Sequence, residues 1–192
     1  MPNWCTTSYA LTGGRKEVRS LYNKMKRLQE RKTPLVPNGF GTTWLGCLVK
    51  ALGGDPEKVY CRGQWSGLRL TPEGVLFFDT EHAWSRPAEV EMLLEKAYPS
   101  LRIYFLEEEL GMDIFQTNDA AGEYFKEQVI IDEESEGMEY YTEEAALEHL
   151  TELAGKPITS WEEAEAFTNA LNEAQDEAEG EGHVWIHRAD IY

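Results

Sequence analysis

Three residues that could perform acid–base chemistry, Asp79, Glu81 and His82, lie together at the end of the apolar run VLFFD (75–79). A carboxylate within hydrogen-bond reach of an imidazole can act as a general acid–base pair. The same residues are also explained without catalysis, by an Asp79 that caps the end of a strand and an exposed His82. Because short motif matches carry a high false-positive risk, we favour the second interpretation and keep Asp79 and His82 as catalytic alternatives.

A second group of residues has the types that bind metals. His183 and His187 are four positions apart, and Cys47 and Cys61 could add thiolate ligands. The separation of the two cysteines, however, is not the short Cys-x-x-Cys spacing of a zinc knuckle. We therefore expect no structural metal and no cofactor, with both histidines at the surface or partly buried.

Cys5 lies near the start of the chain and could be either a nucleophile or a packing residue. It has no charged neighbour in the sequence to lower its thiol pKa. The stretch WCTTSYALT (4–12) alternates as a half-buried strand does, so we expect both Trp4 and Cys5 to be buried. Cys5 then behaves as a small hydrophobic residue, and the odd count of three cysteines indicates reduced thiols rather than disulfides.

The elements that would position these residues follow one another as strand, helix, strand, strand, helix and strand. They are expected at 4–12, 15–32, 67–70, 75–79, 85–98 (capped by Ser85) and 101–108, with a further strand at 112–116. Residues 33–64 are an irregular insertion with room for a short helix at 44–52. This order predicts an α+β, ferredoxin-like split βαβ sandwich over residues 1–120, in which helices cover one face of an antiparallel sheet.

Residues 121–192 have a different pattern. A strand is expected at 125–131, helices at 142–154 and 160–178, and a final strand at 183–192. The apolar positions of both helices predict an acidic, mainly helical C-terminal region that packs on the first domain.

The net charge of −17 is divided unevenly along the chain. Residues 1–106 hold 15 Lys/Arg and 10 Asp/Glu, whereas residues 107–192 hold 3 Lys/Arg and 25 Asp/Glu. The acidic half should repel nucleic acid and anionic membranes and attract basic proteins. The helix expected at 15–32 carries eight Lys/Arg against two Glu, which leaves RNA or single-stranded DNA binding as an alternative.

Four segments carry a resemblance to a known family: MPNWC (1–5), GTTW (41–44), FFDTEHAW (77–84) and YPSLRIYFLEEELGM (98–112). In this order they resemble phage- and plasmid-borne proteins that begin with MPNWC and contain a YubB-type ferredoxin-like domain. The resemblance implies that fold and an origin in a mobile element, but no activity. The chain departs from the family at Thr7, where relatives commonly have Asn, and at GTTWL (41–45), where they often have GTKWD.

These observations predict a non-catalytic accessory protein that binds a basic host or element protein in the bacterial cytoplasm. An ordered row of carboxylates can imitate the phosphates of DNA, so an inhibitor of a nucleic-acid-binding defence protein is one form of this function. The alternatives are an enzyme that uses Asp79 and His82, and nucleic-acid binding by the basic half. The acidic residues expected to contact the partner are Glu143, Glu144, Glu148, Glu152, Glu162, Glu163, Glu173, Asp176 and Glu177.

Overall fold

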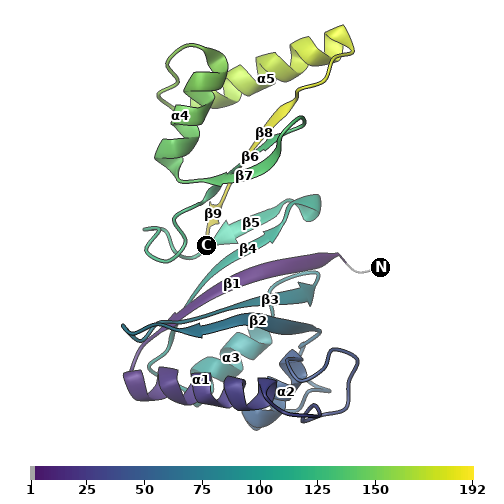
Figure 1. Ribbon diagram of the computed structural model, residues 1–192, viewed down its shortest axis with the longest axis vertical. Helices are drawn as coiled ribbons and strands as arrows, with labels where there is room; N and C mark the ends of the chain where they lie inside the picture. The colour runs from purple at the N-terminus through teal and green to yellow at the C-terminus, as the bar shows by residue number, and fades with distance from the viewer. Residues whose placement is uncertain (1–2) are drawn as a thin grey trace. The chain divides into compact units, whose positions relative to one another are not determined.

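The computed structural model of the chain describes residues 3–192, so Met1 and Pro2 of the MPNWC segment lie outside the described residues. The chain divides into two compact units, unit 1 (Met1–Asn118) and unit 2 (Asp119–Tyr192). Each unit combines helices with strands, which makes the protein a mixed α and β protein (Figure 1).

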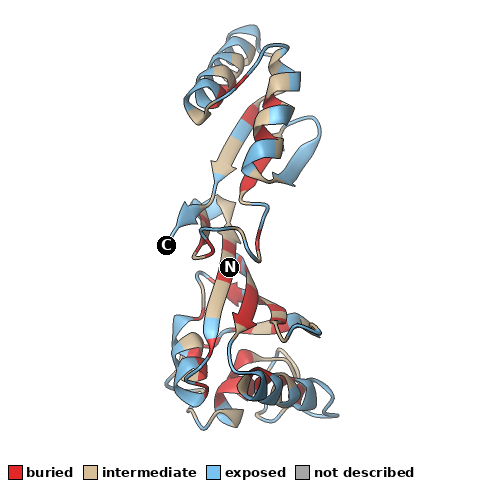
Figure 2. Cartoon of the chain, turned by 90° about the vertical axis from the view of Figure 1, so that its left-hand side faces the viewer, coloured by how far each residue is buried: buried red, intermediate tan, exposed pale blue. Residues whose placement is uncertain are grey.

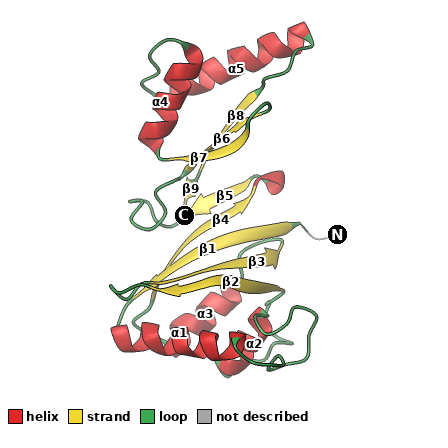
Figure 3. Cartoon of the chain, in the orientation of Figure 1, coloured by secondary structure: helices red, strands yellow, loops and turns green. Residues whose placement is uncertain are grey.

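The strands of unit 1 form an antiparallel sheet in the order β2-β3-β1-β4-β5. They are β1 (Trp4–Thr12), β2 (Gly63–Leu70), β3 (Leu76–Ala83), β4 (Arg102–Glu109) and β5 (Ile114–Thr117). The helices α1 (Arg15–Gln29), α2 (Leu45–Ala51) and α3 (Ala88–Ala97) lie along one face of this sheet (Figure 3). A short 3-10 helix, η1 (Leu110–Met112), connects β4 to β5.

Strand β1 lies inside the sheet because it pairs with β3 on one side and with β4 on the other. Its alternate residues Cys5, Thr7, Tyr9 and Leu11 are all buried. Tyr9 is opposite Phe78 on one neighbour and Phe105 on the other, and these side chains belong to the main hydrophobic core of unit 1. The predicted burial of Cys5 is therefore confirmed.

The predicted burial of Trp4 is wrong, since this side chain is 41% exposed. Successive residues of a strand point to opposite faces of the sheet, so the position before a buried Cys5 faces away from the helices. The indole instead contacts the ring of Phe40 edge-on, with 6.3 Å between the ring centroids.

The β2–β3 hairpin is longer than the expected strands at 67–70 and 75–79. Strand β2 begins at Gly63, inside the expected insertion, and β3 continues to Ala83. The turn between them is closed by a hydrogen bond from the Gly74 amide to the Thr71 carbonyl at 3.1 Å. Because β3 is long, His82 lies within a strand rather than beyond its end.

Helix α3 begins later than the sequence predicts. Pro87 is the residue before its first turn, and no side chain caps this end, so the expected cap by Ser85 is wrong. Trp84 has φ +74°, and the chain between Trp84 and Pro87 turns from β3 towards the helix. Arg86 lies in this connection, beside the end of β3.

Unit 2 contains a three-stranded antiparallel sheet in the order β7-β6-β8 and two helices. The elements are β6 (Val129–Glu133), β7 (Gly137–Tyr141), α4 (Glu143–Ala154), α5 (Trp161–Ala178) and β8 (Val184–Arg188), followed by the short β9 (Asp190–Ile191). The two helices hold more residues than the strands, as expected, but a sheet that the sequence did not predict as such also contributes to the hydrophobic core of the unit. That core includes Val129, Ile131, Leu150, Ala164 and Val184.

Both helices of unit 2 begin with side-chain caps, within one residue of the predicted starts at 142 and 160. The Thr142 hydroxyl accepts a hydrogen bond from the Ala145 amide, and the Ser160 hydroxyl accepts one from the Glu163 amide, both at 3.3 Å. Such caps satisfy amides that the first turn of a helix leaves without intrahelical partners. Helix α4 ends at Gly155, whose φ of +63° is readily adopted by a residue without a Cβ.

Within residues 3–192, no helix combines the length and the apolar character that crossing a membrane requires.

Candidate functional site

The predicted catalytic alternatives, Asp79 and His82, do not form an acid–base pair. Both lie in β3, but residues 79 and 81 face one side of the sheet and residue 82 faces the other. The Asp79 carboxylate accepts a hydrogen bond from the Ser8 hydroxyl at 2.7 Å. His82 is completely buried, so its expected exposure is wrong.

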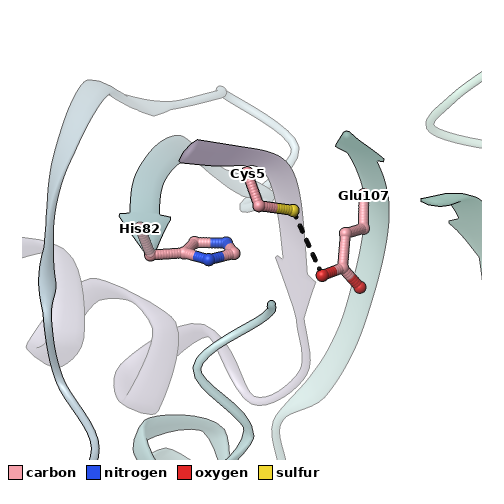
Figure 4. Close-up of side chains that lie close together, drawn as sticks. All are labelled: Cys5, His82 and Glu107. Atoms are coloured by element: carbon pink, nitrogen blue, oxygen red, sulfur yellow. Dashed lines mark hydrogen bonds between the residues drawn. The ribbon is translucent and has the colours of Figure 1, made fainter. Parts of the chain in front are cut away.

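His82 belongs instead to a buried polar cluster with Cys5 and Glu107, which we call the Cys–His–Glu cluster (Figure 4). The three residues come from the adjacent strands β3, β1 and β4, and each is at most 1% exposed. Strand register places Cys5 opposite His82 and Thr7 opposite Glu107. One potential ligand atom from each of the three residues lies within 4.8 Å of the other two.

Hydrogen bonds hold each member of the Cys–His–Glu cluster in place. The Cys5 thiol donates to Glu107 Oε1, with 3.3 Å between the heavy atoms. His82 Nε2 and the Thr7 hydroxyl oxygen are 2.8 Å apart. His82 Nδ1 makes no hydrogen bond of good geometry. The backbone of Ser85 nevertheless lies near enough to the ring to favour its charged form.

The Glu107 carboxylate is anchored by groups from two further segments. Its Oε1 accepts from the Arg86 backbone amide at 2.6 Å, and its Oε2 accepts from Gln116 Nε2 at 2.6 Å. The Arg86 guanidinium lies 3.8 Å from Oε2, pairs with Glu91 at 2.8 Å and covers the ring of Phe105. The carboxylate therefore has a fixed position beside Cys5.

The protonation states of the cluster do not suit nucleophilic catalysis. Burial, reinforced by the charge of Glu107, raises the pKa of the Cys5 thiol, so the thiolate is disfavoured at neutral pH. Burial lowers the pKa of His82 to about 4, which makes its imidazole neutral. A thiol, a neutral imidazole and a carboxylate are a set of potential metal ligands rather than an activated nucleophile.

The other predicted metal candidates are separated by the extended backbone. His183 directly precedes β8 and His187 lies within it, and four residues of extended backbone span about 13 Å, so the two imidazoles cannot share one ion. His183 contacts Glu134 and Asp176 instead. Within residues 3–192, the Cys–His–Glu cluster is the group of three or more His, Cys, Asp or Glu side chains close enough to hold a metal.

The nine carboxylates predicted to contact a partner are all exposed on α4 and α5, and we call them the acidic surface. The outward sides of both helices are largely exposed (Figure 2). Unit 2 carries 21 Asp/Glu and 3 Lys/Arg, a net charge of −18, whereas unit 1 has a net charge of +1. Glu163 has a local role as well, because its carboxylate accepts from the Thr159 amide at 2.7 Å.

One histidine lies beside the acidic surface and is sensitive to pH. His183 Nδ1 is 2.8 Å from Glu134 and its Nε2 is 3.0 Å from Asp176, while its ring stacks on Trp185. These hydrogen bonds raise the pKa of His183, and the bonds from His183 and Gly182 lower the pKa of Glu134 to about 2.

We expect an NMR titration of the imidazole to give His183 a pKa above the ordinary value of about 6.5. Asp176→Asn should lower that pKa, because the second carboxylate partner is removed. Because the pKa of His183 is higher in the folded than in the unfolded chain, the protonated imidazole stabilises the folded protein. This stabilisation is fully present below about pH 6.5 and is lost as the pH rises through the folded-state pKa. An unchanged His183 pKa in Asp176→Asn would contradict the observed contact.

Basic residues in α1 and just after its end line a surface hollow of about 280 Å³. Lys24, Arg27 and Arg31 line it together with apolar residues. Each of these three side chains also donates to a nearby backbone carbonyl.

Comparisons with protein-family models, with curated proteins and with solved structures give no match to this chain. The resemblance to the phage- and plasmid-borne family therefore stays a prediction.

No motif in the sequence pointed to Glu107, or to Arg86 and Gln116, which bind its carboxylate. One signal pointed to Glu107. In the strand LRIYFLEEE (101–109), the alternation that buries Phe105 also places residue 107 on the buried face. A carboxylate at such a position requires polar partners, and these come from segments distant in sequence.

Proposed function

We propose that this protein is a non-catalytic binding protein whose acidic surface docks a basic protein partner in the bacterial cytoplasm. The observation that carries the proposal is the exposure of nine carboxylates on α4 and α5, in a unit with a net charge of −18. Charge of this density steers a basic partner towards the surface and raises its association rate.

The carboxylates are also ordered, which favours a specific docking surface over a solvated tail. Both helices are capped, and they pack on the core of unit 2 through residues such as Leu150 and Ala164. Glu144, Glu148 and Glu152 recur every four residues, or about 6 Å along α4. A regular row of carboxylates resembles the row of phosphates along DNA, which supports binding by DNA mimicry.

We further propose a ferredoxin-like fold for unit 1. The order β2-β3-β1-β4, with α1 after β1 and α3 after β3, supports this assignment. Helix α2 and strand β5 are then additions to the βαββαβ arrangement. The assignment is compatible with the sequence resemblance to mobile-element proteins, in which an inhibitor of a host nucleic-acid-binding protein would have a use.

The proposal is tested by reversing charges at matched positions. In Glu144→Lys/Glu148→Lys/Glu152→Lys, we expect the affinity for the partner to fall about tenfold or more, equal to about 1.4 kcal/mol. The partner is first captured from nuclease-treated bacterial lysate on the full-length chain and identified by mass spectrometry. Binding is then measured by surface plasmon resonance at low and physiological salt.

The control variant is Glu57→Lys/Glu73→Lys/Glu95→Lys, which makes the same change in net charge at exposed positions of unit 1. It should bind nearly as well as the wild type. The wild-type association rate should fall with added salt, because the Debye length shortens from about 30 Å at 0.01 M to about 8 Å at 0.15 M. Equal losses in the two variants would show that net charge alone matters. Tight binding of the wild type to RNA would contradict the proposal and favour nucleic-acid binding by the basic helix α1.

A further inference from the structure

We propose that the Cys–His–Glu cluster of unit 1 is a zinc site, in which Cys5, His82 and Glu107 bind one Zn²⁺. The proposal is independent of the acidic surface, which lies in unit 2. It starts from the convergence of three different ligand types within 4.8 Å on adjacent strands, at positions that are 0–1% exposed.

The donor set fits zinc better than other common divalent ions. Zinc accepts thiolate sulfur, imidazole nitrogen and carboxylate oxygen in tetrahedral sites, whereas Mg²⁺ and Ca²⁺ require oxygen ligands. Three protein ligands leave one tetrahedral position for a water molecule.

The charge balance also favours an ion at this position. Zinc binding releases the Cys5 proton to solvent and forms the sulfur–zinc bond, which converts the thiol into a bound thiolate. One Zn²⁺ then balances one thiolate and one carboxylate, so the buried group is neutral overall. Without the metal, the Cys5 thiol donates to Glu107 and shares that carboxylate with Arg86 and Gln116.

Groups around the three ligands are arranged to orient them. Gln116 and the backbone amide of Arg86 fix the Glu107 carboxylate, and Thr7 is 2.8 Å from His82 Nε2. Such outer hydrogen bonds usually hold metal ligands in position. His82 Nδ1 is buried and makes no hydrogen bond of good geometry, although the Ser85 backbone lies near the ring.

No short sequence motif contains the three proposed zinc ligands, because they are far apart in the chain. Cys5 and Glu107 are 102 residues apart, and only strand pairing brings them together. Zinc would connect β1, β3 and β4 near the start of the chain. The proposed zinc site contradicts the expectation from the sequence that the protein binds no metal. The zinc content of the purified protein decides between the two.

Full-length protein without a histidine tag, produced in zinc-supplemented medium and purified without chelators, should contain about one equivalent of zinc per chain by elemental mass spectrometry. After the zinc is removed by a chelator, the melting temperature should fall by several degrees, and zinc but not Mg²⁺ should restore it. Refilling with Co²⁺ should produce a thiolate-to-cobalt charge-transfer absorption, which reports a sulfur ligand directly.

Three variants assign the metal to this cluster. Cys5→Ser should lose the zinc and the charge-transfer absorption, while Cys61→Ser, which alters another buried cysteine, should keep both. His183→Ala/His187→Ala should also keep the zinc, which excludes the histidines of unit 2. If Cys5→Ser does not fold, the cobalt spectrum of the wild-type protein still decides the question. Less than a tenth of an equivalent of zinc with no charge-transfer band, or loss of zinc from either control variant, would overturn the proposal.

Discussion

Replacing Arg86 with Ala should lower the free energy of unfolding of unit 1 by about 3–5 kcal/mol. The Arg86 guanidinium is only 17% exposed and pairs with two carboxylates, the partly buried Glu91 at 2.8 Å and the buried Glu107 at 3.8 Å. In the metal-free protein, its removal leaves both carboxylates without their cationic partner, and an uncompensated buried charge is much more costly than a broken surface pair. Chemical denaturation followed by circular dichroism measures the change.

The matched control is Arg62→Ala, which removes an exposed arginine from the same unit and should change stability by less than about 1 kcal/mol.

The pH dependence of the stability of Arg86→Ala distinguishes lost charge from lost packing against Phe105. Burial already raises the pKa of Glu91, and loss of Arg86 removes an influence that lowers it. The folded variant should then hold a proton more tightly than the unfolded chain, so its stability deficit should shrink as the pH falls. A deficit that does not vary with pH would indicate packing alone.

Replacing Leu150 with Ala should cost about 2–5 kcal/mol and selectively loosen unit 2. Leu150 lies in α4 and is completely buried in the hydrophobic core of unit 2. A unit of 74 residues has a stability of about 4–11 kcal/mol by the usual value per residue, so this loss is a large part of the total. Hydrogen exchange measured by mass spectrometry should show faster exchange in β6 and α4, with peptides of unit 1 unchanged.

Leu153→Ala is the control, since it makes the same substitution in the same helix at a side chain that is 41% exposed. It should have little effect on exchange. Leu150→Ala keeps every carboxylate of the acidic surface, so it also tests whether the surface must be ordered. Weaker partner binding in Leu150→Ala than in Leu153→Ala would support a shaped docking surface, whereas equal binding would mean that charge alone suffices. Unchanged exchange throughout unit 2 would contradict the assigned core position of Leu150.

Patterns that depend on neighbours in the sequence could be predicted without the structure. The alternation in β1 indicated a buried Cys5, and the helical period of α4 and α5 placed nine carboxylates on the exposed side. The two helices of unit 2 also begin within one residue of the starts that the sequence predicts. Each of these features is decided by residues within a few positions of one another, so the local pattern contains the whole signal.

Polar residues in buried strands were misjudged for a definite reason. The run from Asp79 to His82 looks like the end of a strand, yet β3 continues because Thr80 and His82 find buried polar partners on β1. Strand β7 was missed in the opposite way. Its residues are mostly exposed and show no alternation, and it is a strand because its backbone pairs with β6. Neither outcome can be read from a short window of sequence.

The Cys–His–Glu cluster depends on tertiary structure most strongly. Cys5, His82 and Glu107 have no motif spacing, and their meeting is set by the register of β1 against two other strands. A shift of one residue in either pairing would turn a ligand to the opposite face of the sheet. Sequence alone therefore determines which segments are helical, which carry the charge and which face of β1 is buried. The fold decides which polar side chains share a buried site, because strand register is fixed by packing between segments about a hundred residues apart.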